Sequence, residues 1–144
     1  MSTMNITDIT DNGNKLLVRV ISGKDWPSGI QFYTEDDHFI QVATMNYEEN
    51  HHMKAHRHNV YERTVMRTNE VFVIIDGRVG ATVYDDNGEV MEHVLLSKGD
   101  IAIFFAGGHA FDVIDDDTRI IEIKNGPFFG VEKDKTFIHK GEDN

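Results

Sequence analysis

Short runs of β-branched and aromatic residues, separated by turn residues, constrain the fold of this chain more than any other feature. The runs span residues 15–22, 29–34, 38–46, 69–76, 79–84, 90–97, 101–105, 109–114 and 118–124. Asp86-Asn87-Gly88-Glu89 lies between two of them and predicts a hairpin with a type I′ turn. Helical periodicity is scarce. Many short strands with regular turns are typical of a β-sandwich or barrel, so we expect an all-β fold.

The length of the chain sets the number of domains. With 144 residues, of which 40% are hydrophobic, it can bury one real core and is too short for two ordinary domains. Both ends are polar. We therefore expect one domain over residues 15–139, a flexible N-terminus over 1–14 and a flexible tail over 140–144.

Charge and composition exclude several classes of protein. The formal net charge of −11 argues against binding to nucleic acid or to an anionic membrane surface. No apolar stretch approaches the roughly 20 residues of a membrane helix, and the first residues lack the pattern of a signal peptide. The absence of cysteine excludes disulfides, thiolate zinc sites and a cysteine nucleophile. We expect a soluble cytoplasmic protein.

One segment is basic within this acidic chain. From Lys54 to Thr68 the chain carries four basic residues against one acidic residue, Glu62. Arg63 and Arg67 are therefore candidates to bind an anionic small molecule, because a guanidinium forms paired hydrogen bonds with phosphate or carboxylate. The alternative is that these arginines pair with acidic groups on the protein surface, where ion pairs contribute little.

Four side chains have the types and order of a metal site. In an extended strand, residues two apart point to the same side, so His56 and His58 can aim at one point. Glu70 opens an apolar run and His109 follows a Gly-Gly pair, so both could join from neighbouring strands. Three imidazoles and one carboxylate suit iron, manganese, nickel, zinc or copper. Glu62 is closer to His58 than Glu70 is, but no apolar strand follows it.

The pattern resembles the cupin family, small β-barrels of jelly-roll type. The first cupin motif is Gly, five residues, His-x-His, three or four residues, Glu, six residues, Gly. His56 and His58 match the histidine pair, and Glu70 with Gly77 matches the second half. Asn50 takes the place of the leading glycine, and the gap before Glu70 is longer than usual, which we interpret as an inserted loop over 59–69.

The second cupin motif is matched more loosely. The family has Gly, five residues, Pro-x-Gly, two residues, His, three residues, Asn. Here Gly99 is followed by Phe105 in place of the proline, one residue is missing before His109, and Val113 replaces the asparagine. These departures change the spacing around His109, and the resemblance as a whole spans about residues 39–124.

The resemblance implies a jelly-roll barrel in a small single-domain bacterial cupin. It implies a divalent transition metal on His56, His58, Glu70 and His109, and an isomerase, epimerase or dioxygenase acting on a small oxygenated anion such as a sugar derivative. The aromatic wall of the pocket would include Phe72 and Phe111, although these side chains can equally be plain core.

Two alternatives to this function stay open. In cupins similar to the sugar-nucleotide ketoisomerases, barrel histidines act as acid and base without metal; here those would be His56 or His58, with Tyr61 assisting. A second alternative is a non-catalytic module that binds a small molecule. The family also implies a homodimer, in which the strand around residues 16–21 is a candidate for exchange, unless it is an ordinary strand of its own subunit.

Overall fold

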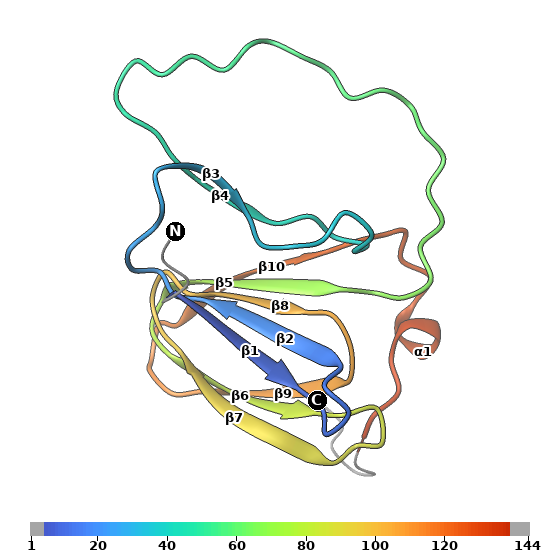
Figure 1. Cartoon of the computed structure of the whole chain (residues 1–144). Helices are drawn as coiled ribbons and strands as arrows, with labels where there is room; N and C mark the ends of the chain where they lie inside the picture. The colour runs from blue at the N-terminus through green and yellow to red at the C-terminus, as the bar shows by residue number, and fades with distance from the viewer. Residues whose placement is uncertain (1–4, 139–144) are drawn as a thin grey trace.

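The computed structural model describes residues 5–138, which form an almost entirely β structure (Figure 1). Its ten strands are β1 (Ile6–Thr10), β2 (Leu16–Ile21), β3 (Gly29–Phe32), β4 (Ala43–Asn46), β5 (Glu70–Asp76), β6 (Val79–Tyr84), β7 (Val90–Leu96), β8 (Ile101–Phe104), β9 (Gly108–Val113) and β10 (Arg119–Lys124). One short helix, α1 (Val131–Asp134), follows them. The expected all-β, jelly-roll type of single domain is confirmed.

The strands form three antiparallel sheets. The largest has the order β1-β2-β8-β5-β10, the second has the order β7-β6-β9, and β3 pairs with β4 alone. The first two face each other and bury the main core between them, with side chains such as Ile74 from β5 and Val83 from β6. The two facing sheets do not close into a complete barrel, because β9 and β10 end their sheets in the described part of the chain.

A second apolar cluster covers the outer face of the five-stranded sheet. Alternate residues of β5 and β8 point in opposite directions, so Val71 and Ile103 face away from the main core. They pack there with Ile21, Tyr33 and Phe105. This layer places β3 and β4 on the outer side of the sheet, as Figure 1 shows. The five-stranded sheet is therefore buried on both faces near its centre.

The structure corrects the expected boundaries at the N-terminal end. Residues 6–10, which the sequence places in a flexible N-terminus, form β1 and pair with β2 from Ile6↔Ile21 to Thr10↔Leu16. In the described part of the chain, β2 pairs with β1 on one side and with β8 on the other. The two isoleucines of Ile-Thr-Asp-Ile-Thr are three residues apart, so the period of two that marks a strand is absent from this segment. The tail at 140–144 lies outside the described residues.

The turn between β6 and β7 also differs from its expected type. A type I′ turn needs left-handed backbone at both central residues, but of Asn87 and Gly88 only Gly88 has a positive φ, 82°. Asp85 instead organises a longer connection: its carboxylate accepts hydrogen bonds from the backbone N–H groups of Asn87 and Glu89, both at 2.9 Å. The hairpin forms as expected, with different turn chemistry.

Residues 47–69 connect β4 to β5 without any helix or strand. We call residues 47–67 the arm. Every side chain in it is exposed, and Figure 1 shows it as an arch that stands away from the sheets. Within residues 5–138, no helix has the length and apolar character that crossing a membrane would require.

Candidate functional site

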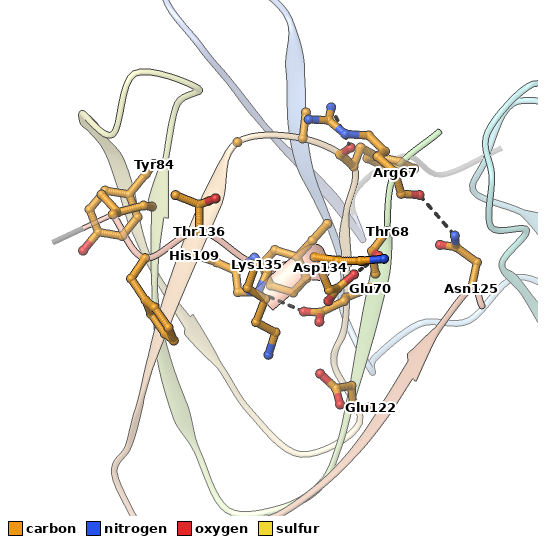
Figure 2. Close-up of a pocket in the computed structure, with 18 of the residues that line it drawn as sticks. Arg67, Thr68, Glu70, Tyr84, His109, Glu122, Asn125, Asp134, Lys135 and Thr136 are labelled. Carbon is orange, nitrogen blue, oxygen red and sulfur yellow. Dashed lines mark hydrogen bonds and ion pairs between the residues drawn. The ribbon is translucent and has the colours of Figure 1, made fainter. Parts of the chain in front are cut away.

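A cavity of about 750 Å³ lies between the two facing sheets, at the side where β9 and β10 end them. Its walls come from β5, β8, β9 and β10, from residues 65–68 at the end of the arm, and from the C-terminal segment 125–138. Figure 2 shows the polar side chains that line it. Two of the four predicted metal ligands, Glu70 and His109, are among them.

Glu70 and His109 form an ion pair across the cavity. Glu70 stands at the start of β5 in one sheet, and His109 stands on β9 in the other, opposite Val83 of β6. Their Oε2 and Nε2 atoms are 2.9 Å apart, and both side chains point toward one another in Figure 2. The Glu70 side chain is almost wholly buried, while the His109 side chain is about a quarter exposed to the cavity.

The electrostatic environment keeps Glu70 ionised. The hydrogen bond from His109 lowers the pKa of Glu70, and this outweighs the opposing effect of burial. The charge on His109, a hydrogen bond with Glu122 and the positive charge of Lys135 lower the pKa further. The Glu70 carboxylate therefore accepts a hydrogen bond from the Nε2–H group of His109, and Nδ1 is the other nitrogen of that imidazole ring.

An aromatic wall surrounds the pair. The rings of Phe72 and Phe111 stack with centroids 4.2 Å apart, and the Phe104 ring lies 4.4 Å from that of His109. All three phenylalanines line the cavity, while Phe72 and Phe104 also belong to the main core. Phe72 therefore belongs both to the main core and to the wall of the cavity, the two roles that the sequence allowed for it. Such a wall lowers the local dielectric and strengthens the Glu70/His109 interaction.

Cationic side chains also line the cavity. Arg67 is the one of the two predicted arginines that reaches it, and Lys133 and Lys135 join from the C-terminal segment. Arg67 Nη1 donates a hydrogen bond to the carbonyl of Phe105 at 3.5 Å, and Nη2 lies 4.0 Å from Asp86 Oδ1. Arg67 therefore lines the cavity and also lies close to the carboxylate of Asp86. This position is compatible with both interpretations of the residue, as a ligand-binding arginine and as a member of a surface ion pair.

The C-terminal segment is the part of the site that the sequence reasoning did not include. It is held to the end of the arm, because Thr68 donates a hydrogen bond to Asp134 and the Asn125 side chain donates one to the carbonyl of Arg67 at 3.1 Å. Both contacts are drawn in Figure 2. The sequence of 131–138, Val-Glu-Lys-Asp-Lys-Thr-Phe-Ile, contains a run of four charged residues that resembles an ordinary surface tail, so the sequence alone carried no strong signal.

The remaining predicted site residues lie on the arm, apart from the cavity pair. His56 and His58 are exposed, with ring centroids 5.3 Å apart, and His56 Nδ1 is 2.9 Å from the carbonyl oxygen of Lys54. The Arg63 guanidinium lies 5.9 Å from the centre of the Tyr61 ring, also on the arm. In residues 5–138 no three His, Asp or Glu side chains are grouped so that they could hold a metal ion. The donor types fit a metal, but this arrangement does not bring the four together.

Two positions, Asn50 and Gly107, have left-handed backbone. Asn50, in place of the leading glycine, has φ 67°, in the left-handed region. Gly107 has φ 68°, and a Cβ there would lie 2.1 Å from the carbonyl oxygen of Tyr84. Gly107, two residues before His109, is therefore needed for the close approach of two backbone segments.

The comparisons with known proteins add no further constraint. Neither a scan against protein-family models nor searches of curated proteins and of solved structures find a match to this chain.

Proposed function

We propose that this protein is a cupin-type enzyme that acts on a small, oxygenated, anionic molecule in the cavity between its two sheets, with His109 and Glu70 as its acid–base pair. The observation that carries the proposal is the ion pair at 2.9 Å inside a cavity of about 750 Å³. A cavity of this size suits a ligand of the dimensions of a sugar phosphate or a somewhat larger conjugate. The jelly-roll type of fold and the two motifs support the assignment to the cupin family.

The pair supplies what proton transfer between neighbouring carbons requires. His109 Nδ1 takes a proton from the carbon beside a carbonyl, and the electron pair of that C–H bond forms an enediol as the carbonyl oxygen gains a proton. Return of the carbon-bound proton to the former carbonyl carbon, with loss of the proton on the neighbouring hydroxyl, moves the carbonyl by one position. No oxidant or reductant is needed. Glu70 stabilises the imidazolium formed on the way.

The cations account for the anionic part of the ligand. Arg67, Lys133 and Lys135 line the cavity, in a protein whose net charge is −11. A phosphate or carboxylate placed there would keep the uncharged carbons next to the aromatic wall and His109. This division of roles gives Arg67 the binding role predicted for it, and gives the acid–base role to His109 rather than to His56 or His58.

The experiment follows solvent deuterium into a substrate carbon. Sugar phosphates, sugar nucleotides and hydroxy acids are first screened as stabilisers of the protein, and those that bind are incubated in D2O and read by NMR. We expect deuterium at the carbon beside a carbonyl. His109→Gln should slow incorporation by roughly 10²- to 10⁴-fold. His93→Gln is the matched control, because His93 is an exposed histidine on β7.

Binding without deuterium incorporation or turnover would favour the non-catalytic binding module. Incorporation that His109→Gln leaves unchanged would show that the acid–base pair is assigned to the wrong residues.

A metal-dependent version is the second candidate. Glu70 and His109 already place a carboxylate and an imidazole at one point of the cavity, and the last residues of the arm that carries His56 and His58 line the same cavity. A divalent transition metal on these four side chains would supply Lewis acidity. Elemental mass spectrometry on protein purified without chelator or affinity metal tests it. Near-stoichiometric metal that His56→Ala and His109→Ala both lose, and His52→Ala keeps, would establish this version.

A further inference from the structure

The C-terminal segment, residues 125–138, crosses the side of the cavity where β9 and β10 end their sheets. It begins directly after β10, and its last described residue, Ile138, reaches the opposite sheet. A Cβ added to Gly108, the first residue of β9, would lie 2.3 Å from Ile138 Cδ1, and one added to Gly88 would lie 3.1 Å from Ile138 Cγ2. Figure 1 shows this path, with α1 between its two ends. The segment therefore connects the two facing sheets at this side of the cavity.

The packing of this segment against the sheets is sparse. No residue from 126 to 138 is buried, and Phe129 and Phe137 are each more than half exposed. The backbone–backbone hydrogen bonds that the structure describes for these residues join one part of the segment to another, as from the N–H of Lys135 to the carbonyl of Val131 at 2.8 Å. A segment with few buried contacts and no hydrogen-bond ladder to its neighbours opens at a lower free energy than a core strand. We therefore expect the segment to open while both sheets stay folded.

Polar contacts at two points hold the segment in place. Its start is held by the Asn125 side chain, which donates to the carbonyl of Arg67 at 3.1 Å and accepts from the backbone N–H of Asn69 at 2.7 Å. Its middle is held by Thr68, whose hydroxyl donates a hydrogen bond to the Asp134 carboxylate. We call this second contact the latch. Breaking the latch would leave the start of the segment attached and its middle free.

Gly130 lies between the two points of attachment and gives the backbone room to turn. Its φ is 103°, in the region that favours glycine, and a Cβ added there would meet no atom of the described residues within 4 Å. Packing therefore does not fix the backbone at this position. Hinges of lids are often a few loop residues that absorb a change in backbone angles. Gly130 is suited to be such a hinge for α1 and the residues that follow it.

The segment also carries groups that would contact a ligand. The cavity is lined by two of its cations and two of its aromatic side chains, Lys133, Lys135, Phe129 and Phe137. The positive charge of Lys135 is one of the influences that lower the pKa of Glu70, so this charge acts at the cavity pair. Movement of the segment toward a ligand would cover exposed phenylalanine surface and exclude water from the site. The cations and the apolar cover therefore reach a ligand together.

We propose that the C-terminal segment is a lid, which opens by release of the Thr68–Asp134 latch to admit a ligand and closes over the ligand once it is bound. Opening also separates Ile138 from β9, while Asn125 keeps the start of the segment attached. Lids of enzymes move on the microsecond to millisecond timescale. Only the contribution of the lid lysines to ligand binding rests on the proposed function; the opening and closing do not.

The first test measures chemical access to His109 in the full-length protein. Diethyl pyrocarbonate acylates imidazoles, and peptide mass spectrometry reads the rate of this reaction at each histidine. The chain contains no cysteine, so a Thr68→Cys/Asp134→Cys variant can form one disulfide, which locks the latch. In the oxidised variant His109 should react more slowly than after reduction, by roughly tenfold or more. His93, which is exposed on β7, is the internal control, because its rate should not change. Equal rates at His109 in the two forms would overturn the proposal.

The second test removes only the hydroxyl of the latch. Thr68→Val keeps the shape of the side chain, and the loss of one hydrogen bond should speed the amide hydrogen exchange of residues 126–138 by about two- to tenfold. Thr68→Ser keeps the hydroxyl and is the matched control, with exchange like that of the wild type. Amides of β5 should not change in either variant. Unchanged exchange of the segment in Thr68→Val, or an equal increase in β5, would contradict the role of the latch.

The lid and the proposed function can fail separately. If the oxidised variant shields His109 but no ligand incorporates deuterium, the lid stands and the proposed chemistry fails. If deuterium enters a ligand at the same rate in the oxidised and the reduced variant, the chemistry stands and the lid fails.

Discussion

β5 and residues 59–66 of the arm both contain strand-forming side chains, which are buried in β5 and exposed in the arm. β5 reads Glu-Val-Phe-Val-Ile-Ile-Asp and pairs with β8 on one side and β10 on the other, so that Val71 is 2% exposed. The arm includes Asn-Val-Tyr-Glu-Arg-Thr-Val-Met over 59–66, and its Val60 is fully exposed. Strand-forming residues become a strand only where neighbouring strands pair with their backbone and a second layer buries their side chains. The difference between the two regions lies in their surroundings.

The largest expected effect concerns burial. Ile74 of β5 is 1% exposed in the main core, and Ile74→Ala should lower the free energy of unfolding by about 2–5 kcal/mol. Val60→Ala in the arm should change it by less than about 0.5 kcal/mol when measured at a protein concentration low enough for monomers. Urea denaturation followed by circular dichroism measures both. Equal losses would mean that the arm packs on its own subunit, and would remove the contrast between the two regions.

A smaller effect compares two left-handed positions. Gly107 has φ 68° beside the Tyr84 carbonyl, so Gly107→Ala should cost about 1–3 kcal/mol through strain and the close Cβ contact. Asn50 in the arm has a similar φ, 67°, and Asn50→Gly should alter stability by less than about 0.5 kcal/mol, because glycine accepts this backbone at least as well. Thermal unfolding of both variants checks this. A large loss in Asn50→Gly would reveal contacts of the asparagine side chain.

The smallest effect is a pH dependence at the cavity pair. The pKa of Glu70 is lowered in the folded protein, mainly by the hydrogen bond from His109. Glu70 therefore contributes stability above its unfolded pKa, near the ordinary value of 4.5, and this contribution is lost as the pH falls through the lowered folded pKa. The difference in unfolding free energy between wild type and Glu70→Gln should shrink over that acidic range.

A double-mutant cycle assigns this pH dependence to the pair. In the His109→Gln background, Glu70→Gln should remove less stability, and the pH dependence of the difference should be weaker. If the acidic decrease is the same with and without His109, another group lowers the pKa of Glu70, with Lys135 and Glu122 as the remaining contributors.

Most of the strand pattern could be predicted from the sequence, and the reasons for the errors are local. β5, β6 and β8 are continuous or alternating apolar runs between clear turn residues, so the expected ranges 69–76, 79–84 and 101–105 agree with the strands to within a residue. β1 was not predicted because a five-residue edge strand with two apolar positions resembles a polar tail. The turn at Asp85 was misassigned because its geometry depends on side-chain hydrogen bonds that the dipeptide Asn-Gly does not reveal.

The candidate site was predictable only in part. Glu70 and His109 were chosen from their positions in two motifs. In the structure, Glu70 Oε2 and His109 Nε2 are 2.9 Å apart. Phe72, Phe111 and Arg67 line the same cavity, as expected for ligand-binding residues. Lys133 and Lys135 could not be found in this way, because they reach the cavity through a C-terminal segment whose path depends on contacts with Thr68 and Asn125. Whether His56 and His58 join the pair stays a prediction.

The sequence by itself determined the all-β character of the protein and the periodicity that sends Glu70 and Phe72 to one face and Val71 to the other. These are short-range consequences of side-chain alternation and turn chemistry, which act within a few residues. Only the tertiary structure decided that Glu70 and His109, from strands in different sheets, form a buried ion pair, and that the arm stands apart from them. Such decisions depend on which strand edges are satisfied and which surfaces are covered, and these are properties of the assembled chain rather than of any segment of it.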